Sequence, residues 1–209
     1  MLNEDTRTPM PLLKGSRLMM KPIEPQDAPR LLDILADPQV IKYVTQSSFF
    51  SFARSRRIAS ELLSTGRRDS LHMGIWLHGE RELAGVVSMQ HWREEKRDAM
   101  IGYMLAKAYW GRGIATEALG LMLHYAFTEL KLLHIEGRCH AVNMASARVM
   151  QKNGMQLSRT FQHRRMFFAA PVEMMVYAHT DRTYDEYRKG LQLQANQENA
   201  PNLQSYEIR

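Results

Sequence analysis

Cysteine is almost absent from this sequence: Cys139 is the only one among 209 residues. A lone cysteine excludes an internal disulfide framework and fits a reducing compartment, so we expect a cytoplasmic protein. Long apolar runs are also missing, since none approaches the roughly 20 residues that a membrane-spanning helix needs. The first ten residues, MLNEDTRTPM, are polar and lack the apolar core of a signal peptide. We therefore expect no membrane partner.

A nucleic-acid-binding motif is missing as well, although the chain carries a formal net charge of +6. Arginines are concentrated in one short region, at Arg54, Arg56, Arg57, Arg67 and Arg68. They can form a site for an acidic partner, such as a phosphate or a nucleic acid, or simply a solvated helix face. The second interpretation is favoured, and no direct nucleic-acid binding is expected. The charge can still steer an anionic cofactor toward the protein.

The residues that are present suffice for one globular domain, because apolar residues make up 44% of the chain and charged residues 24%. Strand patterns cover residues 17–21, 71–77, 83–92, 99–105, 134–140, 155–168 and 172–179. Helical spacing covers residues 25–35, 52–63, 113–130 and 143–152. This order predicts an α/β (α+β) fold, with a mixed sheet of about seven strands flanked on both faces by about four helices.

The two ends of the chain differ from this pattern. Residues 1–14 predict a flexible leader, and residues 15–190 a single domain. The tail, residues 191–209, is rich in amides and poor in apolar residues, which favours disorder or weak docking.

A glycine-containing turn between a strand and a helix is the most informative segment of the sequence. It runs from Trp110 to Ala115 and contains Gly111 and Gly113. Unpaired N–H groups and the helix dipole favour an anion at a helix start, and glycines let a phosphate approach the backbone closely. Arg112 adds a positive charge. An ordinary strand-to-helix turn is the competing interpretation, since two glycines alone are a weak signal.

The wider context of this turn resembles a known family. The run Trp110-Gly-Arg-Gly-Ile-Ala115 is similar to the Q/R-x-x-G-x-G/A cofactor loop of the GNAT acetyltransferases, with Trp110 at the position of the usual Gln or Arg. The longer run to Leu119 resembles the RimJ/RimL-like branch, typified by ribosomal-protein N-terminal acetyltransferases. The resemblance covers residues 16–180 and implies a mostly antiparallel sheet. Further matching landmarks are Arg17-Leu18, Asp37-Pro38, Leu83-Ala84-Gly85, Ile101-Gly102-Tyr103, Asn143-Met-Ala-Ser146 and Asn153-Gly154.

The resemblance implies acetyl-CoA as the cofactor, held between the fourth and fifth strands of the family's sheet. Its pantetheine arm is expected to pair with the fourth strand, at Met104, Leu105 and Ala106. Its pyrophosphate is expected on the turn and the first residues of the helix: Trp110, Gly111, Arg112, Gly113, Ile114, Ala115 and Thr116.

The same resemblance implies direct transfer of the acetyl group to an amine, without an acyl-enzyme. Cys139 is therefore not expected to be a nucleophile, and a buried structural cysteine is favoured. Asn143 is expected on the pantetheine arm and Ser146 near the thioester sulfur as a proton donor. A purely structural role is the alternative, because asparagine is a favoured helix N-cap.

A general base cannot be transferred from the family. Relatives carry a glutamate where this chain has Met100, or one where it has Ser158. The remaining candidates are His91, Glu94, Glu95, Asp98 and Glu173, each of which can equally be a surface charge. Glu94 and Glu173 join Ser146 as our expected catalytic residues.

The acceptor is expected to be a peptide or protein N-terminal α-amine. Such an amine, with a pKa of about 7.7–8.0, is roughly 10% neutral at pH 7, whereas a lysine amine needs far more help from a base. A small amine, such as an amino acid, an antibiotic or a metabolite, is the first alternative, and an acyl-CoA-binding sensor is the second. A homodimer is compatible with these hypotheses. Aromatic residues expected around the acceptor are Tyr43, Phe49, Phe50, Phe52, Trp92, Phe161, Phe167 and Phe168.

Overall fold

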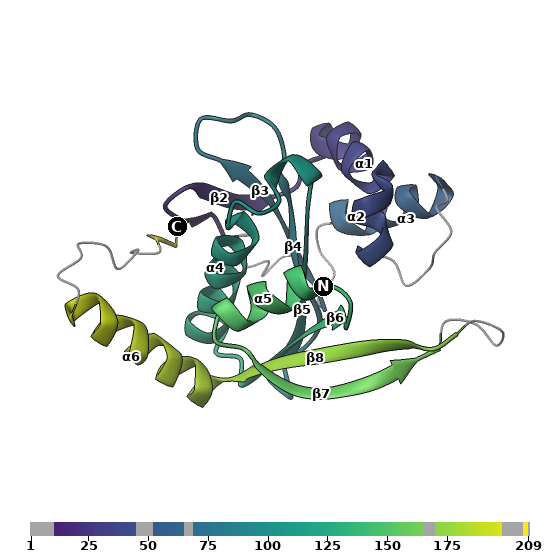
Figure 1. Ribbon diagram of the computed structural model, residues 1–209. Coiled ribbons are helices and arrows are strands. Elements are labelled where there is room, and N and C mark those ends of the chain that lie inside the picture. The colour runs from purple at the N-terminus through teal and green to yellow at the C-terminus, as the bar shows by residue number, and fades with distance from the viewer. Residues whose placement is uncertain (1–10, 45–51, 65–68, 165–169, 198–206, 209) are drawn as a thin grey trace, which may run out of the picture.

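The computed structural model describes residues 11–44, 52–64, 69–164, 170–197 and 207–208. These residues form a nine-stranded sheet with helices on both faces (Figure 1). The strands are β1 Leu13–Lys14, β2 Leu18–Pro22, β3 Leu71–Leu77, β4 Gly85–Arg93, β5 Asp98–Leu105, β6 His134–His140, β7 Gln156–His163, β8 Val172–Thr180 and β9 Glu207–Ile208. The helices are α1 Ala28–Ala36, α2 Pro38–Val44, α3 Phe52–Leu63, α4 Ile114–Thr128, α5 Met144–Lys152 and α6 Asp181–Gln197, with 3-10 turns at Pro25–Asp27 and Lys107–Tyr109.

The sheet has the order β7-β8-β6-β5-β4-β3-β2-β1-β9. Its strands pair antiparallel except for β5 and β6, which are parallel and joined by the crossover helix α4. A parallel pair needs such a crossover, whereas the antiparallel pairs β3–β4 and β4–β5 are joined by short turns. The mixed, mostly antiparallel α/β fold expected from the sequence is therefore confirmed.

The two faces of the sheet carry different helices. A Cβ on Gly137 of β6 would lie 2.6 Å from the sulfur of Met150, so this face of β6 packs closely under α5. Neighbouring residues of a strand point to opposite faces. His140 accordingly points to the other face, where its ring meets Tyr43 of α2 at a centroid distance of 6.2 Å. We call these two sides the α5 face and the acceptor face.

Helix α4 forms the centre of the α5 face. Its side chains are apolar almost all round, and ten of them are buried, because the helix lies between the sheet and its neighbours. Asn153, at the end of α5, donates its side-chain amide to the Thr116 carbonyl of α4 at 3.1 Å. The two helices are therefore tied together where the chain leaves α5.

The expected stop at Asp37-Pro38 is also the start of a further helix, α2, which the sequence interpretation missed. Proline suits the first position of a helix, because the missing N–H would have no helical partner there. The Asp37 carboxylate accepts a hydrogen bond from the Gln39 amide at 2.8 Å. The same two residues thus end α1 and begin α2.

Some residues that the sequence assigned to the leader and the tail form regular secondary structure. Of the leader, residues 1–10 lie outside the described residues, but Leu13 is 1% exposed and pairs with Met20 in the sheet. The amide-rich tail begins as part of α6, which continues to Gln197. Tyr184 of α6 stacks on Phe127 of α4 at 4.7 Å, so aromatic packing anchors this helix despite its polar sequence.

No helix among the described residues is both long enough and apolar enough to cross a membrane.

Candidate active site

The parallel strands β5 and β6 separate in the middle of the sheet. They pair from Asp98 with His134 to Ile101 with Gly137. Beyond these pairs, within the described ranges, β5 continues to pair with β4 and β6 with β8. We call the resulting gap in the ladder, between residues 102–105 and 138–140, the β5–β6 opening.

Two residues of β5 turn their backbone groups toward this opening. Peptide groups along an antiparallel strand alternate between its two sides. The Ala106 amide donates to the Ala84 carbonyl at 2.9 Å, so the Ala106 peptide group faces β4. Met104, two residues earlier, pairs with Val86, so its peptide group faces β4 as well. The peptide groups of Tyr103 and Leu105 therefore face the opening. Of the three residues expected to hold a pantetheine arm, Leu105 alone has its backbone on that side.

Trp110 occupies part of this backbone edge. Its indole Nε1 donates a hydrogen bond to the Leu105 carbonyl at 2.9 Å. The indole thereby links the glycine-containing turn to the end of β5. This contact gives a structural reason for a tryptophan at the first position of the turn.

The turn itself has the left-handed conformation that favours glycine. Gly111 has φ 72° and Gly113, the N-cap of α4, has φ 76°. The Glu117 amide makes the first helical hydrogen bond, to the Gly113 carbonyl at 3.1 Å. The amides of Ile114, Ala115 and Thr116 precede it and have no carbonyl one turn earlier in the helix. The turn therefore has the geometry of an anion site.

An ion pair between the half-exposed Arg17 and the buried Glu117, which the sequence interpretation missed, fixes the shape of this turn. The Glu117 side chain is 3% exposed and accepts from the Arg17 Nε at 2.7 Å and the Arg17 amide at 2.8 Å. Arg17 in turn donates to the carbonyls of Arg112 (2.8 Å) and Gly113 (3.2 Å). Ser16 adds a hydroxyl bond to Glu117 at 3.1 Å. We call Arg17 and Glu117 the turn clamp.

Arg112 is exposed and stands over the ring of Tyr109, with 5.4 Å between its guanidinium carbon and the ring centroid. The Tyr109 hydroxyl donates to Glu80 at 2.7 Å, which fixes the ring. The cation is therefore held beside the turn by a cation–π contact.

Ser146 lies on the α5 face, opposite β5. Its hydroxyl is 2.8 Å from the Tyr103 hydroxyl, which also lies 3.0 Å from the Ser146 carbonyl. Asn143 caps α5, because its side-chain oxygen accepts from the Ser146 amide at 3.2 Å. The structural role of Asn143 is thus present, and it orients the turn of helix that carries Ser146.

Cys139 and Tyr103 are both protonated at neutral pH. Burial raises the pKa of Cys139 to about 11, against the opposing effect of a hydrogen bond with Ser146. Burial also raises the pKa of Tyr103, again opposed by its hydrogen bond with Ser146. A buried thiol with such a pKa is a poor nucleophile, in line with the structural role expected for Cys139.

Most of the expected carboxylates lie at the wrong end of β5. Glu94 and Glu95 are in the turn between β4 and β5, before Asp98, and Asp98 itself lies about 16 Å from Tyr103 at ~3.3 Å per residue. Asp98 is bound by Arg93, whose hydrogen bonds lower the pKa of this carboxyl. His91 lies near the same end, in a bulge of β4. Glu94, one of the expected catalytic residues, therefore lies before the start of β5, whereas the opening is at the far end of this strand.

Two groups lie near the outer end of the opening. Glu173 of β8 is exposed, and its carbonyl accepts from the Ala141 amide at 2.9 Å, just beyond β6. Met174 pairs with His140 and therefore shares its face of the sheet. Glu173 is the residue before Met174, so the Glu173 side chain points to the opposite face, the α5 face. His140 is 8% exposed and points to the acceptor face. The sequence interpretation missed His140, because the direction of its side chain depends on the contact between Gly137 and α5.

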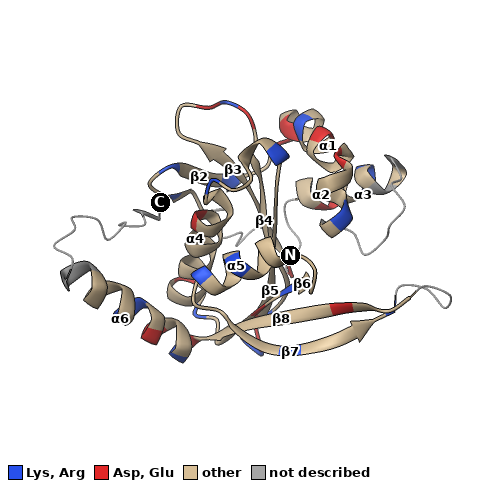
Figure 2. Ribbon diagram, viewed as in Figure 1, with Lys and Arg blue, Asp and Glu red and all other residues tan. Residues whose placement is uncertain are grey.

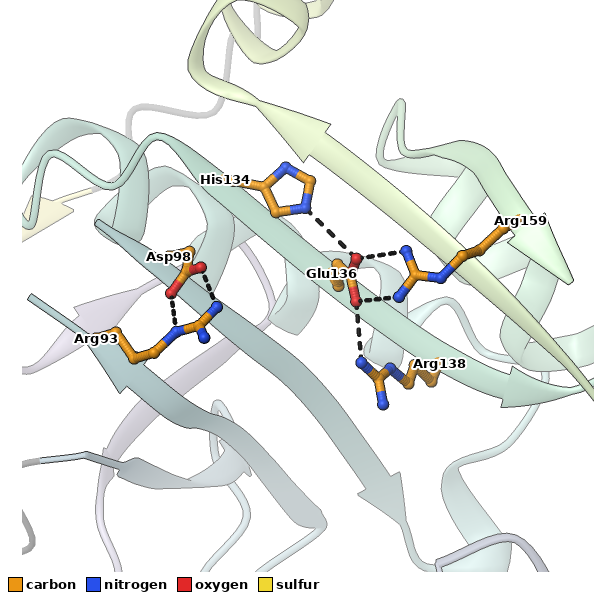
Figure 3. Close-up of polar contacts among 6 residues, drawn as sticks. All are labelled: Arg93, Asp98, His134, Glu136, Arg138 and Arg159. Atoms are coloured by element: carbon orange, nitrogen blue, oxygen red, sulfur yellow. Dashed lines mark hydrogen bonds and ion pairs between the residues drawn. The ribbon is translucent and has the colours of Figure 1, made fainter. Parts of the chain in front are cut away.

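Glu136, also missed, lies on the acceptor face of β6 within a cluster of cations (Figure 3). Arg159 contacts both carboxylate oxygens at 2.7 and 3.1 Å, Arg138 contacts one at 3.1 Å, and His134 lies at 3.6 Å. The hydrogen bonds from Arg159 and Arg138 lower the pKa of Glu136 to about 2. So strongly held a carboxylate is a poor proton acceptor at neutral pH.

Some residues expected around the acceptor do not belong to the described part of the chain. Phe49, Phe50, Phe167 and Phe168 lie outside the described residues, as do Arg67 and Arg68. Tyr43 reaches the acceptor face through its contact with His140. Arg57 forms an exposed pair with Glu61 on α3, as expected of a solvated helix face.

Comparisons with known proteins agree with this geometry. A family model described as acetyltransferase (GNAT) domain matches residues 17–156. The probable N-acetyltransferase YjcK of Bacillus subtilis is 33% identical over 68% of this chain and 82% of its own. The putative ribosomal N-acetyltransferase YdaF of the same species is 29% identical over 65% and 75%. The structure of Mycobacterium smegmatis RimJ in complex with CoA-disulfide has a TM-score of 0.69 and 24% identity, over 83% of this chain and 88% of its own. This chain therefore belongs to the GNAT family of N-acetyltransferases.

Proposed function

We propose that this enzyme transfers the acetyl group of acetyl-CoA to the α-amine of a peptide or protein, as a member of the RimJ/RimL-like branch. The observation that carries the proposal is the β5–β6 opening, which joins a turn with the geometry of an anion site at one end to Ser146 at the other. The name of the relative YdaF, a putative ribosomal N-acetyltransferase, supports a protein acceptor.

The turn and the backbone edge of β5 would hold the cofactor. The amides of residues 114–116 and the guanidinium of Arg112 suit the pyrophosphate, because they combine N–H donors, the α4 dipole and a positive charge. The peptide groups of Tyr103 and the amide N–H of Leu105 suit the amides of the pantetheine arm, in place of Met104 and Ala106. The Leu105 carbonyl bonds to Trp110. Donors and acceptors along the opening would thus extend the interrupted ladder onto the ligand.

The α5 face would hold the leaving group. In the transfer, the amine nitrogen bonds to the thioester carbon, the C–S bond breaks, and the thiolate needs a proton or a hydrogen bond. The Ser146 hydroxyl is our candidate for this role, and Tyr103 is a positioning residue, since its hydroxyl bonds to Ser146. Asn143 orients the same helical turn from its N-cap. Glu173, on this face but exposed, stays a candidate for proton exchange with solvent.

The acceptor would approach from the opposite face, over Gly102. A Cβ built on Gly102 meets nothing within 4 Å, so the strand has open space at the level where β5 and β6 separate. Gly102 also lacks a positive φ, so other residues can replace it without backbone strain.

We expect Gly102→Val to obstruct the acceptor and spare the cofactor. Valine suits a strand, so the fold and the acetyl-CoA affinity should be unchanged. kcat/KM for a peptide should fall by about tenfold or more, equivalent to ~1.4 kcal/mol of transition-state binding. Steady-state kinetics and calorimetric titration with CoA measure the two effects. Normal turnover by the variant would place the acceptor elsewhere.

His140 is our candidate for the proton acceptor, in place of the missing family carboxylates. It is the histidine at the opening on the acceptor face, and neutral imidazole is the commonest general base in enzymes.

We expect His140→Gln to lower kcat by about tenfold at pH 7, where roughly 10% of an α-amine is neutral without help. The deficit should shrink toward pH 9, because the amine is then deprotonated in solution. A pH–rate profile of both proteins tests this. A deficit that is constant with pH would assign His140 a structural role only.

A panel of acceptors tests the proposed function itself. CoA thiol release is measured with peptides that have free N-termini, with the same peptides blocked at the N-terminus but containing lysine, and with small amines. Release with free N-termini alone supports the proposal. Release with small amines alone supports a small-molecule acetyltransferase, and tight acetyl-CoA binding without release supports a sensor.

A further inference from the structure

The acceptor face has a cationic character near the opening. Charged residues are sparse along the central strands in Figure 2, but several meet around Glu136 on β6 (Figure 3). We call the six residues of Figure 3 the ionic cluster: Arg93, Asp98, His134, Glu136, Arg138 and Arg159. Its arginines exceed its carboxylates by one charge, and a protonated His134 adds another.

Both carboxylates of the ionic cluster are already neutralised. Glu136 is bound by Arg159 and Arg138, and Asp98 by Arg93. A guanidinium has five N–H donors, and the bonds to Glu136 use two donor groups of Arg159 and one of Arg138. Both arginines are partly exposed, at 47% and 38% of their side-chain surface. The cluster can therefore accept a further anion, while it repels a polycation.

The position of the cluster relative to the opening defines the length of the acceptor. Arg138 is the first residue of β6 beyond the last parallel pair, so it lies level with Gly102. Glu136 is level with Met100, two residues before Gly102, over which the amine would approach, or ~7 Å along the strand. An extended peptide spans about 3.3–3.6 Å per residue. The distance therefore matches a carboxylate two residues away from the reacting amine, and exceeds the few ångströms between the amine and the carboxylate of a free amino acid.

We propose that Arg138 and Arg159, held side by side by Glu136, bind an acidic side chain at the second or third position of the acceptor peptide. This inference rests on the proposed function and specifies its substrate class. Glu136 acts as a positioning residue, because its carboxylate holds the two guanidinium groups in one orientation. The cluster thereby selects peptides with an acidic N-terminal region over neutral or basic ones.

Four peptides of equal length test the selection. They have serine at the N-terminus and differ in two residues: glutamates at positions 2 and 3, glutamines there, lysines there, or glutamines there with the two glutamates moved to positions 7 and 8. We expect kcat/KM for the first to exceed that for the second and fourth by about tenfold, mainly through KM, since charge-assisted bonds are screened at an exposed site. The lysine peptide should be the poorest substrate.

Arg138→Gln and Arg159→Gln variants connect the selection to the cluster. Each should reduce the preference for glutamate at positions 2 and 3 to about twofold, while the thermal midpoint and the CoA affinity stay near those of the parent. Arg182→Gln is the matched control, because Arg182 forms an exposed ion pair with Glu186 on α6, and it should keep the full preference.

Each outcome bears on the inference. Equal turnover of all four peptides overturns it and leaves the proposed function intact. A preference that survives both arginine variants also overturns it, because the acidic residues are then recognised elsewhere. If no peptide reacts, whether or not small amines do, the inference falls together with the proposed function.

Discussion

Gly113→Val should nearly abolish acetyl-CoA binding, with an affinity loss of about 100-fold or more, or ~2.7 kcal/mol. Two effects combine at this position. A β-branched residue strongly disfavours φ 76°, and a Cβ there would lie 3.3 Å from a guanidinium nitrogen of Arg17. The turn must then change shape, which displaces the amides at the start of α4. Calorimetric titration with CoA measures the loss.

Gly79→Val is the matched control for this variant. Gly79 has φ 82° in the turn between β3 and β4, and a Cβ there meets nothing within 4 Å. The control should therefore show the backbone strain of roughly 1–2 kcal/mol as reduced stability, but no loss of CoA affinity. If both variants bind CoA equally well, the turn at Gly113 is not the phosphate site.

Glu117→Ala should be the most destabilising single change at the site, at about 3 kcal/mol, or roughly 6–12 °C in Tm for a domain of this size. It removes the acceptor of bonds from the Arg17 guanidinium, the Arg17 amide and the Ser16 hydroxyl. The estimate lies at the lower end for a broken buried pair, because the Arg17 side chain is 50% exposed and can be solvated.

Arg17→Lys separates stability from cofactor binding at the same clamp. A lysine keeps the charge near Glu117 but cannot reproduce the planar fork that also reaches the carbonyls of Arg112 and Gly113. We expect Tm to fall by less than half the loss in Glu117→Ala, with CoA affinity reduced by about tenfold. Thermal unfolding measures the change in stability, and calorimetric titration with CoA measures the change in affinity. Unchanged affinity in Arg17→Lys would show that the clamp supports the fold alone.

The sequence predicted best those parts of the fold whose pattern is local. β3 and β6 have the bounds expected from periodicity, and the start of α4 follows directly from the glycine turn. The chain ends were less predictable, because their structure depends on partners elsewhere in the fold. Leu13 is part of a strand because it pairs with Met20, and α6 is anchored by aromatic contacts to α4. An amide-rich segment has no local signal for such anchoring.

The candidate site was predictable to a similar degree. The resemblance to the family pointed to the turn and to Ser146, but the turn clamp joins residues 100 positions apart in the sequence, which a local pattern cannot connect. Glu94 was one of the candidate bases that remained because Met100 and Ser158 replace the family's carboxylates. The structure shows that β5 leads away from Glu94, toward the opening. His140 and Glu136 were missed since their common face is defined by the packing of Gly137 under Met150.

The separation of β5 and β6 also has a mechanical consequence. The sheet consists of two antiparallel halves, and along its strands a seam of four residue pairs joins them. The bond from Asn153 to Thr116 braces the halves from the helix side. A ligand in the opening would touch both halves beyond the end of this seam. Its binding would then restrict the motion of the two halves relative to each other, so the whole sheet, rather than the turn alone, would become stiffer.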